Sequence, residues 1–272
     1  MKHDADTAAA IAATRSDAAR NWTALGTIVR REVRRILRIW GQTLVPPAIT
    51  MTLYFLIFGN LIGSRVGDMG GYTYMQFIVP GLVMMSVIQN SYGNISSSFF
   101  GAKFGRHIEE LLVSPMPNWV ILGGYVAGAV LRGLMVGVIV LCIAMLFTTV
   151  RIPHPLVTLS TVLLGATIFS LAGFVSAVYA KKFDDVAIVP TFILTPLTYL
   201  GGVFYSVTLL PGWAQALTHA NPIFYMVNAF RFGLLGTSDV PLWVAYALML
   251  GFVVVLAALG LWLLKRGVGL RS

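Results

Sequence analysis

The chain has 272 residues, of which 57% are hydrophobic and only 11% charged, with a formal net charge of +9. A soluble domain carries about 25% charged residues, so the composition places the chain among membrane proteins. Its apolar runs are continuous rather than alternating, which predicts an all-α integral membrane protein instead of a β-barrel. A single cysteine, Cys142, excludes an internal disulfide, and the four histidines have no metal-ligand spacing.

The first 40 residues are polar or amphipathic. Residues 1–21 are rich in alanine and have no apolar core, so they are predicted to be a disordered cytoplasmic tail rather than a secretory signal. Residues 22–40 place apolar side chains at steps of three and four, which predicts a basic amphipathic helix in the membrane interface. Its headgroup-facing residues would be Arg30, Arg31, Arg34, Arg35 and Arg38. The alternative, a calmodulin-target or nucleic-acid helix, fits poorly with the charge-free block that follows.

Residues 41–268 are predicted to form a transmembrane domain of six helices. Crossing the hydrocarbon takes about 20 residues at about 1.5 Å each, and six apolar runs are long enough. These runs are residues 41–62, 76–100, 119–149, 156–180, 186–205 and 240–264. The segment between the last two runs is broken by Pro211, Gly212 and Pro222, so it does not make a clean span of its own.

The distribution of basic residues predicts the orientation. Six spans put both ends of the chain on the same side of the membrane. With the N-terminus inside, the inside segments hold 15 of the 19 lysines and arginines, so both ends are predicted to be cytoplasmic. The net positive charge therefore reports topology, and no nucleic-acid partner is expected.

No set of residues indicates catalysis in this chain. There is no GxxxxGK[ST] phosphate loop, no nucleophile–base pair and no metal cluster, so neither enzyme activity nor a cofactor of its own is expected. None of the ten acidic residues lies well inside a predicted span, which argues against an ion-coupled carrier. A stand-alone channel or secondary carrier remains an alternative. An enzyme acting on lipid is a weaker one, because no His/Asp/Glu cluster marks either membrane face.

Several polar residues lie within the predicted spans. Arg132 is the one charge well inside a span, and it either contacts an anionic headgroup or substrate, pairs across the bundle, or is a structural fixture. The polar residues of the second span either bond neighbouring helices or line a path. Two Gly-xxx-Gly pairs in the third span, at positions 124, 128, 133 and 137, predict close helix contact. The candidate polar path residues are Gln89, Asn90, Asn94, Ser97 and Arg132.

The stretch KFGRHIEELLVSPMP, residues 103–117, is a polar interruption with a helical pattern on the predicted cytoplasmic side. Its apolar face is formed by Ile108, Leu111 and Leu112. Glu109 and Glu110 lie on the polar side, and Pro115 and Pro117 end the helix. Exposed apolar residues need a partner surface and the carboxylates suit a basic one, so a docking helix is favoured over a solvated loop.

The order of these features resembles the type-2 ABC export permeases, the membrane subunits of polysaccharide, lipooligosaccharide and several drug exporters. The stretches FGRHIEELLVSPMPNWVILGGYVAGAVLRG and NPIFYMVNAFRFGLLG (residues 221–236) are similar to the bacterial inner-membrane permease group that includes the nodulation-factor exporter subunit and the YadH-type proteins. The resemblance covers about residues 25–268. The motif around residues 109–117 is its more specific part, because the six-span layout alone is shared widely.

The resemblance implies a homodimeric permease of the bacterial inner membrane, with ATP and Mg²⁺ bound by a separate ABC ATP-binding subunit. Residues 103–115 would be the coupling helix seated in that subunit, residues 22–40 the connecting helix, and residues 207–236 short external re-entrant helices. Spans one, two and five would line the dimer interface and the path. Polysaccharide exporters often have aromatic belts along this path, for which Tyr54, Phe55 and Phe58 would be the candidates here. The ATPase-coupling residues would be Arg106, Ile108, Glu109, Glu110, Leu111, Leu112 and Pro115. The cargo would be lipid-linked, a glycolipid or polysaccharide, or an amphipathic drug-like molecule.

Overall fold

A computed structural model describes the backbone of residues 2–269, and the side chains of residues 17–269 apart from positions 60, 64, 112 and 208. The described chain is mostly helical. Its first part contains α1 (Lys2–Arg38), α2 (Trp40–Thr43), α3 (Val45–Tyr54), the π-helix η1 (Phe55–Ile62), α4 (Gly63–Val66), β1 (Asp68–Met69), β2 (Tyr72–Thr73), α5 (Tyr74–Phe104), α6 (His107–Val113) and α7 (Asn118–Phe147). Its second part contains α8 (Pro155–Tyr179), α9 (Phe183–Val189), the π-helix η2 (Pro190–Leu194), α10 (Thr195–Tyr199), the 3₁₀-helix η3 (Val207–Leu209), α11 (Gly212–His219), α12 (Pro222–Leu235) and α13 (Leu242–Arg266).

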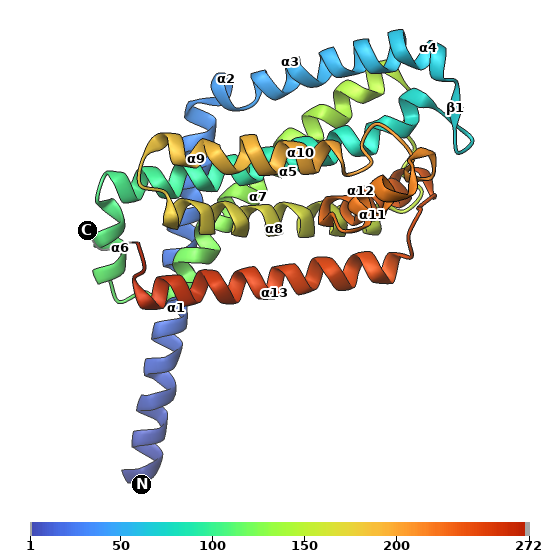
Figure 1. Cartoon of the computed structure of the whole chain (residues 1–272). Helices are drawn as coiled ribbons and strands as arrows, with labels where there is room; N and C mark the ends of the chain where they lie inside the picture. The colour runs from blue at the N-terminus through green and yellow to red at the C-terminus, as the bar shows by residue number, and fades with distance from the viewer. Residues whose placement is uncertain (1, 270–272) are drawn as a thin grey trace.

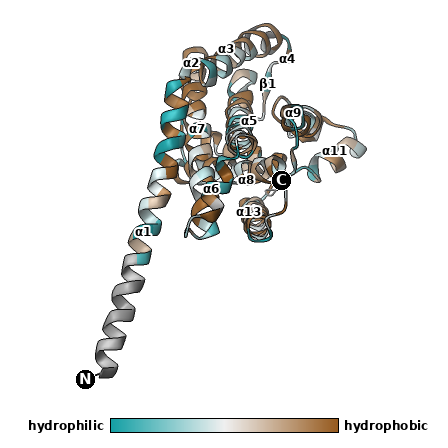
Figure 2. Ribbon diagram, turned by 90° about the vertical axis from the view of Figure 1, so that its left-hand side faces the viewer, coloured by the Kyte–Doolittle hydropathy of each residue, from teal (hydrophilic) through white to brown (hydrophobic). Residues whose placement is uncertain are grey.

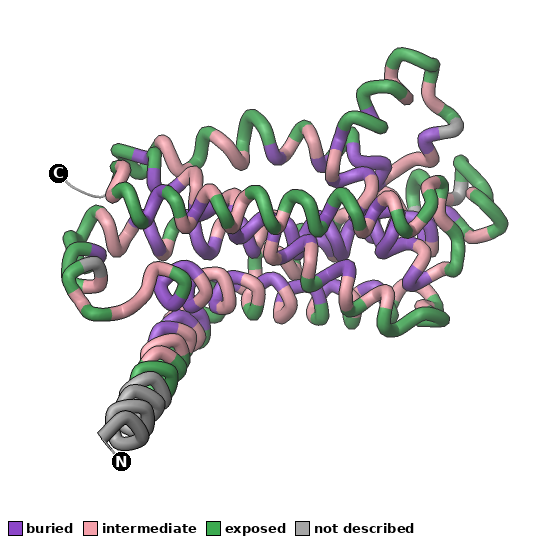
Figure 3. The backbone as a smooth tube through the Cα atoms, turned by 90° about the horizontal axis from the view of Figure 1, so that it is seen from below, coloured by how far each residue is buried: buried purple, intermediate pink, exposed green. Residues whose placement is uncertain are grey.

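The helix α5 is the centre of the fold. It packs against α7 and α8 along most of its length and also contacts α12. Figure 1 shows α5, α8 and α13 running in nearly the same direction, and Figure 3 shows that burial is concentrated in the middle of the bundle. The outer helices keep apolar surface (Figure 2), for example at Val254 and Val255 of α13, which are 66% and 64% exposed. Such surface fits helices that face lipid rather than water.

Four helical segments in the described chain are long and apolar enough to cross a membrane. They are Trp40–Gly59, Asn118–Phe147, Pro155–Tyr179 and Leu242–Arg266. The second predicted span corresponds to α5, which has 31 residues but is more polar. The fifth predicted span is divided into α9, η2 and α10, and prolines at positions 190 and 196 explain the division, because each removes a backbone donor. The count of six spans therefore stays a prediction.

The two ends of the bundle carry different short elements. Figure 1 shows α6 at one end, beside the C-terminal end of α13. The β1–β2 hairpin, α11 and α12 lie at the other end. The predicted range 207–236 is thus occupied by η3, α11 and α12, and α12 packs against α5, α8 and α13.

The helix α1 is longer than the predicted amphipathic helix. It begins at Lys2, so no helix boundary lies at residue 21, and an ion pair of 2.9 Å between Asp17 and Arg20 supports the turn before that point. Alanine is the best helix former, which agrees with helix in this composition. Met1 and the side chains of residues 2–16 lie outside the described residues, so the state of the tail stays a prediction.

The two Gly-xxx-Gly pairs of α7 contact different neighbours. The first pair faces α1: a Cβ atom at Gly124 would lie 2.6 Å from Ile28, and one at Gly128 would lie 2.5 Å from Glu32. The second pair faces α5, where a Cβ at Gly133 would overlap the side chain of a serine. Because these distances are too short for any real Cβ contact, the glycines let α1 and α5 approach the backbone of α7 closely.

Candidate functional site

The polar stretch after α5 forms a short, sharply bounded helix. The helix α6 has seven residues, and Lys103 and Phe104, which the sequence assigns to the coupling helix, are the last residues of α5. Arg106 precedes α6 with a φ of 59°, in the left-handed region. A turn at Gly105 and Arg106 therefore separates the two helices, and the predicted coupling range 103–115 is two elements rather than one.

One apolar residue of α6 faces inward instead of toward a partner. Ile108 is only 1% exposed and packs in a core cluster with Phe100 and Ile121, so its assignment to an exposed docking face is wrong. Leu111, one turn later on the same side, is half-buried against this cluster. A helix this short has little stability of its own, so it must bury one face against the bundle. The side chain of Leu112 lies outside the described residues.

The outward face of α6 carries charge and one apolar residue. Glu109, Glu110 and Pro115 are exposed, as is Arg106, and Val113 is 87% exposed. Among the described residues, neither carboxylate of α6 forms an ion pair. Both lie in the first turn, where their negative charge interacts favourably with the positive end of the helix dipole.

Lys103 fixes the turn before α6 to the end of α8. Its Nζ donates hydrogen bonds of 2.6 Å to the Val178 carbonyl and 2.7 Å to the Ala180 carbonyl. These are carbonyls that a helix C-terminus leaves without a partner, and a cation there also meets the negative end of the helix dipole. Burial lowers the pKa of the Lys103 ammonium. This lysine is thus engaged inside the protein and not available on the outward face.

An aromatic pair missed by the sequence reasoning lies beside α6. Phe104 and Phe183 are 64% and 60% exposed, and their ring centroids are 4.9 Å apart. Phe183 belongs to the KKFDD loop, whose Asp185 carboxylate accepts hydrogen bonds from the backbone of Lys181 at 2.8 Å and of Lys182 at 3.0 Å. These bonds lower the pKa of Asp185 and cap α9. The sequence did contain a signal for this pair, because Phe183 is an apolar residue flanked by two lysines and two aspartates.

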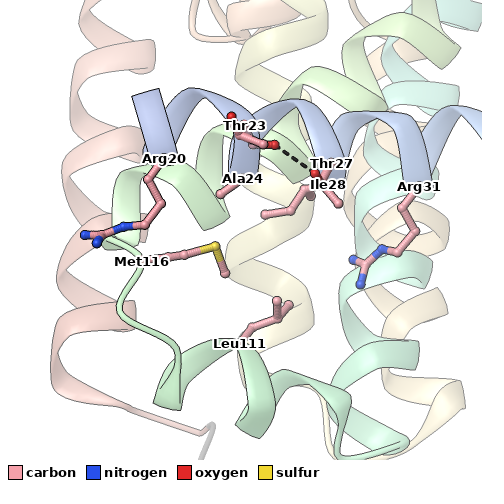
Figure 4. Close-up of a pocket in the computed structure, with 8 residues that line it drawn as sticks. All are labelled: Arg20, Thr23, Ala24, Thr27, Ile28, Arg31, Leu111 and Met116. Carbon is pink, nitrogen blue, oxygen red and sulfur yellow. Dashed lines mark hydrogen bonds between the residues drawn. The ribbon is translucent and has the colours of Figure 1, made fainter. Parts of the chain in front are cut away.

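A cavity of about 440 Å³ separates α6 from α1 (Figure 4). Its lining is Arg20, Thr23, Ala24, Thr27, Ile28, Arg31, Leu111 and Met116. Figure 4 shows Leu111 and Met116 on the side facing α1, with Arg20 and Arg31 at opposite ends. The structure therefore brings the predicted connecting helix and the predicted coupling helix to the same place.

Glu32 is the residue of α1 that the sequence reasoning missed. It is 1% exposed, and the single hydroxyl proton of Ser98 on α5 is shared between both oxygens of its carboxylate, each 2.8 Å from the serine oxygen. It also pairs with Arg35 at 2.9 Å and with Arg31 at 3.5 Å. The signal was its register: positions 28, 32 and 36 share one helix face, and all three are buried.

Two of the five predicted headgroup-facing arginines also bond to protein. Arg31 donates a hydrogen bond of 2.6 Å to the Tyr125 hydroxyl of α7, and Arg35 donates one of 2.8 Å to Asn94 Oδ1 of α5. Arg35 is half-buried, because Glu32 and Asn94 draw it inward, so its assignment to headgroups is corrected. Arg30, Arg31, Arg34 and Arg38 are exposed, and their contact with headgroups stays a prediction.

Arg132 of α7 joins the same polar network. Its guanidinium donates to Asn90 Oδ1 at 3.3 Å and to Asn94 Oδ1 at 3.5 Å, so it pairs across the bundle to α5. A cavity of about 280 Å³ adjoins it. Its lining is Gln42, Thr43, Pro46, Pro47, Thr50, Met51, Ser86, Gln89, Asn90 and Arg132. Three candidate path residues, at positions 89, 90 and 132, are thus brought together. Ser97 is exposed, and its hydroxyl bonds to backbone carbonyls of α5.

The aromatic path candidates separate into two groups. Phe55 is fully buried in the core, where it stacks on Phe147, so it does not line an open path. Tyr54 and Phe58 are half-buried and cluster with Phe204 across from the first span. The hydroxyls of Tyr54 and Tyr199 lie 2.5 Å apart. This cluster joins the first predicted span to the end of the fifth.

A buried arginine near the other end of the bundle holds α12 in place. Arg231 is 3% exposed, donates a hydrogen bond of 2.7 Å to the Gly202 carbonyl, and lies 4.0 Å from the ring centre of Phe77. Its distance to the Asp239 carboxylate is 3.9 Å. These contacts assign Arg231 a packing role. Among the described residues, no group of three or more histidine, cysteine or acidic side chains could hold a metal ion.

Comparison with known proteins decides the family. Residues 23–235 match the family model described as ABC-2 type transporter. The chain belongs to the ABC-2 type transporter family. The inner membrane transport permease YadH of Escherichia coli K12 is 58% identical over 251 residues, which are 92% of this chain and 98% of that protein. Nodulation protein J of Sinorhizobium fredii is 26% identical over 181 residues, 66% of this chain and 68% of that protein. The resemblance stated from the sequence is confirmed, and the ABC-2 match includes α6, α12 and the polar network around Glu32.

Proposed function

We propose that this chain is the permease subunit of an ATP-driven exporter in the bacterial inner membrane. It would work as a homodimer with a separate ABC ATP-binding subunit, which binds the ATP and Mg²⁺ that drive transport. The proposal includes six spans with both ends in the cytoplasm, which the distribution of lysine and arginine supports. The name of the YadH relative, an inner membrane transport permease, supports the location.

The observation that carries the proposal is the outward face of α6. This face exposes Glu109, Glu110 and Val113 on the protein surface, while Ile108 anchors the opposite face of α6 in the core. Two carboxylates around an apolar side chain suit a groove with basic rims on a partner protein. The sequence contains no Walker loop, so such a partner is needed if ATP is to drive transport.

The packing of α6 suggests how movement of the partner would reach the spans. Lys103 ties the turn before α6 to the end of α8, and Ile108 packs against α5 and α7. A displacement of α6 would therefore act on three helices together, because packed elements move as rigid bodies. The cavity between α6 and α1 leaves room for a partner side chain near both helices.

The cargo class remains the broad one given by the resemblance: a lipid-linked molecule, a glycolipid or polysaccharide, or an amphipathic drug-like compound. The aromatic cluster of Tyr54, Phe58 and Phe204 does not select among these, since its rings pack on one another.

The proposal is tested by capturing the ATP-binding subunit on the tagged full-length chain from its native membranes. We expect Glu110→Lys to reduce co-purification and abolish ATP-dependent transport, while the permease still inserts, because the change places a cation on the docking face. Asp68→Lys, the same charge change in the hairpin at the other end of the bundle, should retain both. Full transport by Glu110→Lys would contradict the assignment of α6. Cargo flux through liposomes that contain this chain alone would favour a channel or secondary carrier instead.

A further inference from the structure

The polar network between α1, α5 and α7 carries more positive than negative charge. The guanidinium groups of Arg31 and Arg35 pair with the one carboxylate, that of Glu32, and the guanidinium of Arg132 shares Asn94 with Arg35, so the network has a formal charge of +2. Arg31 reaches toward the cavity beside α6, but Arg35 and Arg132 share the same acceptor, Asn94 Oδ1. Like charges held this close in a partly buried place favour the arrival of an anion.

Arg132 is the least satisfied member of the network. Its two hydrogen bonds, of 3.3 and 3.5 Å, go to neutral amide oxygens and are longer than the roughly 2.8 Å typical of a charged pair. Its Nε is buried and has no hydrogen-bond partner among the described residues. No carboxylate of the described chain lies within ion-pair distance of Arg132. An intramembrane arginine in this state is expected to have a partner that the chain itself does not supply.

The cavity of about 280 Å³ beside Arg132 has a lining that suits an anionic partner. It lies under the bend where the chain passes from α1 through α2 into α3. Its lining combines the arginine with the side chains of Gln42, Thr50 and Gln89, which carry amide and hydroxyl donors, and it contains no acidic residue. Met51 and two prolines supply its apolar part. The cavity therefore has a cationic, donor-rich side next to an apolar side.

The length of α7 places this cavity at the level of the inner leaflet. A helix of 30 residues is about 45 Å long, roughly 15 Å more than the hydrocarbon of a bilayer. The excess belongs at the α1 end, because Trp22, Ile28 and Glu32 of the polar helix α1 pack on the first turns of α7. Arg132 then lies within about two helical turns of the inner hydrocarbon boundary, at a depth that a lipid phosphate can reach.

We propose that this cavity binds a phosphate group, with the Arg132 guanidinium as its anchor. A guanidinium fork fits a phosphate with two parallel hydrogen bonds, and the amides of Gln42 and Gln89 can donate to the remaining oxygens. The phosphate comes either from an amphipathic molecule of the inner leaflet or from a soluble phosphate. The inference rests on the proposed permease function only in its consequence, that the exported cargo carries a phosphate near its apolar part.

Binding is measured on the purified full-length chain in detergent, without any ATP-binding subunit. The probes are dioctanoyl phosphatidic acid, dioctanoylglycerol as the same tails without phosphate, and inorganic phosphate. A ligand that binds only the folded chain raises its Tm in proportion to the logarithm of its concentration over Kd. We expect phosphatidic acid to raise the Tm and dioctanoylglycerol not to do so. A response to inorganic phosphate as strong as that to phosphatidic acid identifies a soluble source, and a response to the lipid alone identifies the leaflet.

Variants assign the site to Arg132. We expect Arg132→Gln to weaken phosphatidic acid binding at least tenfold and Gln89→Leu to weaken it several-fold. Arg151→Gln, the same charge change in the loop after α7, is the matched control and should bind as the unchanged chain does. Where Arg132→Gln is not recovered folded, Arg132→Lys takes its place, with a smaller loss because the point charge remains. Equal binding by these variants, or no phosphate-dependent shift in the unchanged chain, overturns the proposal. Neither result bears on the proposal that α6 docks on an ATP-binding subunit, since no such subunit is present in the assay.

Discussion

Two helices in this molecule, α1 and α6, carry carboxylates that have opposite environments. On α6, Glu109 and Glu110 point outward and make no ion pair within the described chain. On α1, Glu32 is buried, bonds to Ser98 of α5, and pairs with Arg31, which in turn bonds to Tyr125 of α7. The difference comes from register, because Glu32 shares a face with buried isoleucines whereas Glu109 and Glu110 lie opposite Ile108. An exposed carboxylate is free to recognise a partner, but a buried one holds the fold together.

The comparison predicts the largest loss of stability for Glu32→Ala. The change leaves two arginines facing each other without their counter-charge. We expect the free energy of unfolding to fall by about 2 kcal/mol, less than for a fully buried pair because Arg31 and Arg35 are 47% and 32% exposed. Thermal unfolding in detergent measures the effect. Glu32→Gln keeps the shape and an acceptor for Ser98, so it should lose less, and equal stability of all three chains would contradict a structural role for the charge.

The close approach of α1 and α7 is tested next by Gly128→Ala. The added methyl would lie 2.5 Å from the Cβ of Glu32, so α1 must move away. We expect a loss of about 1 kcal/mol, since overpacking outweighs the gain in helix propensity. Gly123→Ala is the matched control: its methyl would lie 3.5 Å from Leu25, an ordinary contact, and that variant should be as stable as the unchanged chain or more so. Equal stability of the two variants would mean that the contact between α1 and α7 adjusts to the added methyl without loss.

On α6 the same kind of change should cost almost nothing in stability. Glu110 is exposed, so we expect Glu110→Ala to change the free energy of unfolding by less than about 0.5 kcal/mol. The contrast with Glu32→Ala, measured by the same thermal unfolding, separates docking from structural carboxylates. A loss at Glu110 as large as that at Glu32 would place α6 among the elements that stabilise the fold.

The smallest expected effect is a pH dependence at the cap of α9. Hydrogen bonds from the backbone of Lys181 and Lys182 lower the pKa of Asp185 in the folded chain. The folded carboxyl thus holds its proton less tightly than the unfolded one, so the stabilisation is complete above the unfolded pKa of about 3.9 and is lost as the pH falls through the lower folded pKa. The protection factors of the α9 amides, which correct the exchange rates for the intrinsic effect of pH, should fall in that acid range. Asp185→Asn should show faster exchange at neutral pH and little further change in acid.

Much of the architecture could be predicted because membrane spans depend on local composition. The segments Trp40–Gly59, Asn118–Phe147, Pro155–Tyr179 and Leu242–Arg266 are apolar over enough residues to cross a bilayer, so these four were visible without contacts. The short segments before α13 were also visible, because proline and glycine act on their own backbone, but the break before α6 was not, since its left-handed residue is Arg106. The division of the fifth span was not predicted, although its two prolines were present.

The site was predicted less completely, because burial is decided by which face a neighbouring helix covers. The sequence by itself determined that α6 carries carboxylates, that α1 carries arginines, and that Arg132 lies within an apolar helix. Only the tertiary structure decided that Ile108 turns inward, that Arg35 and Arg132 meet at Asn94, and that Glu32 is buried. The physical reason is that hydropathy is a property of each residue, whereas a charge network needs side chains from three helices at matched depths, and the glycines of α7 bring those helices close enough.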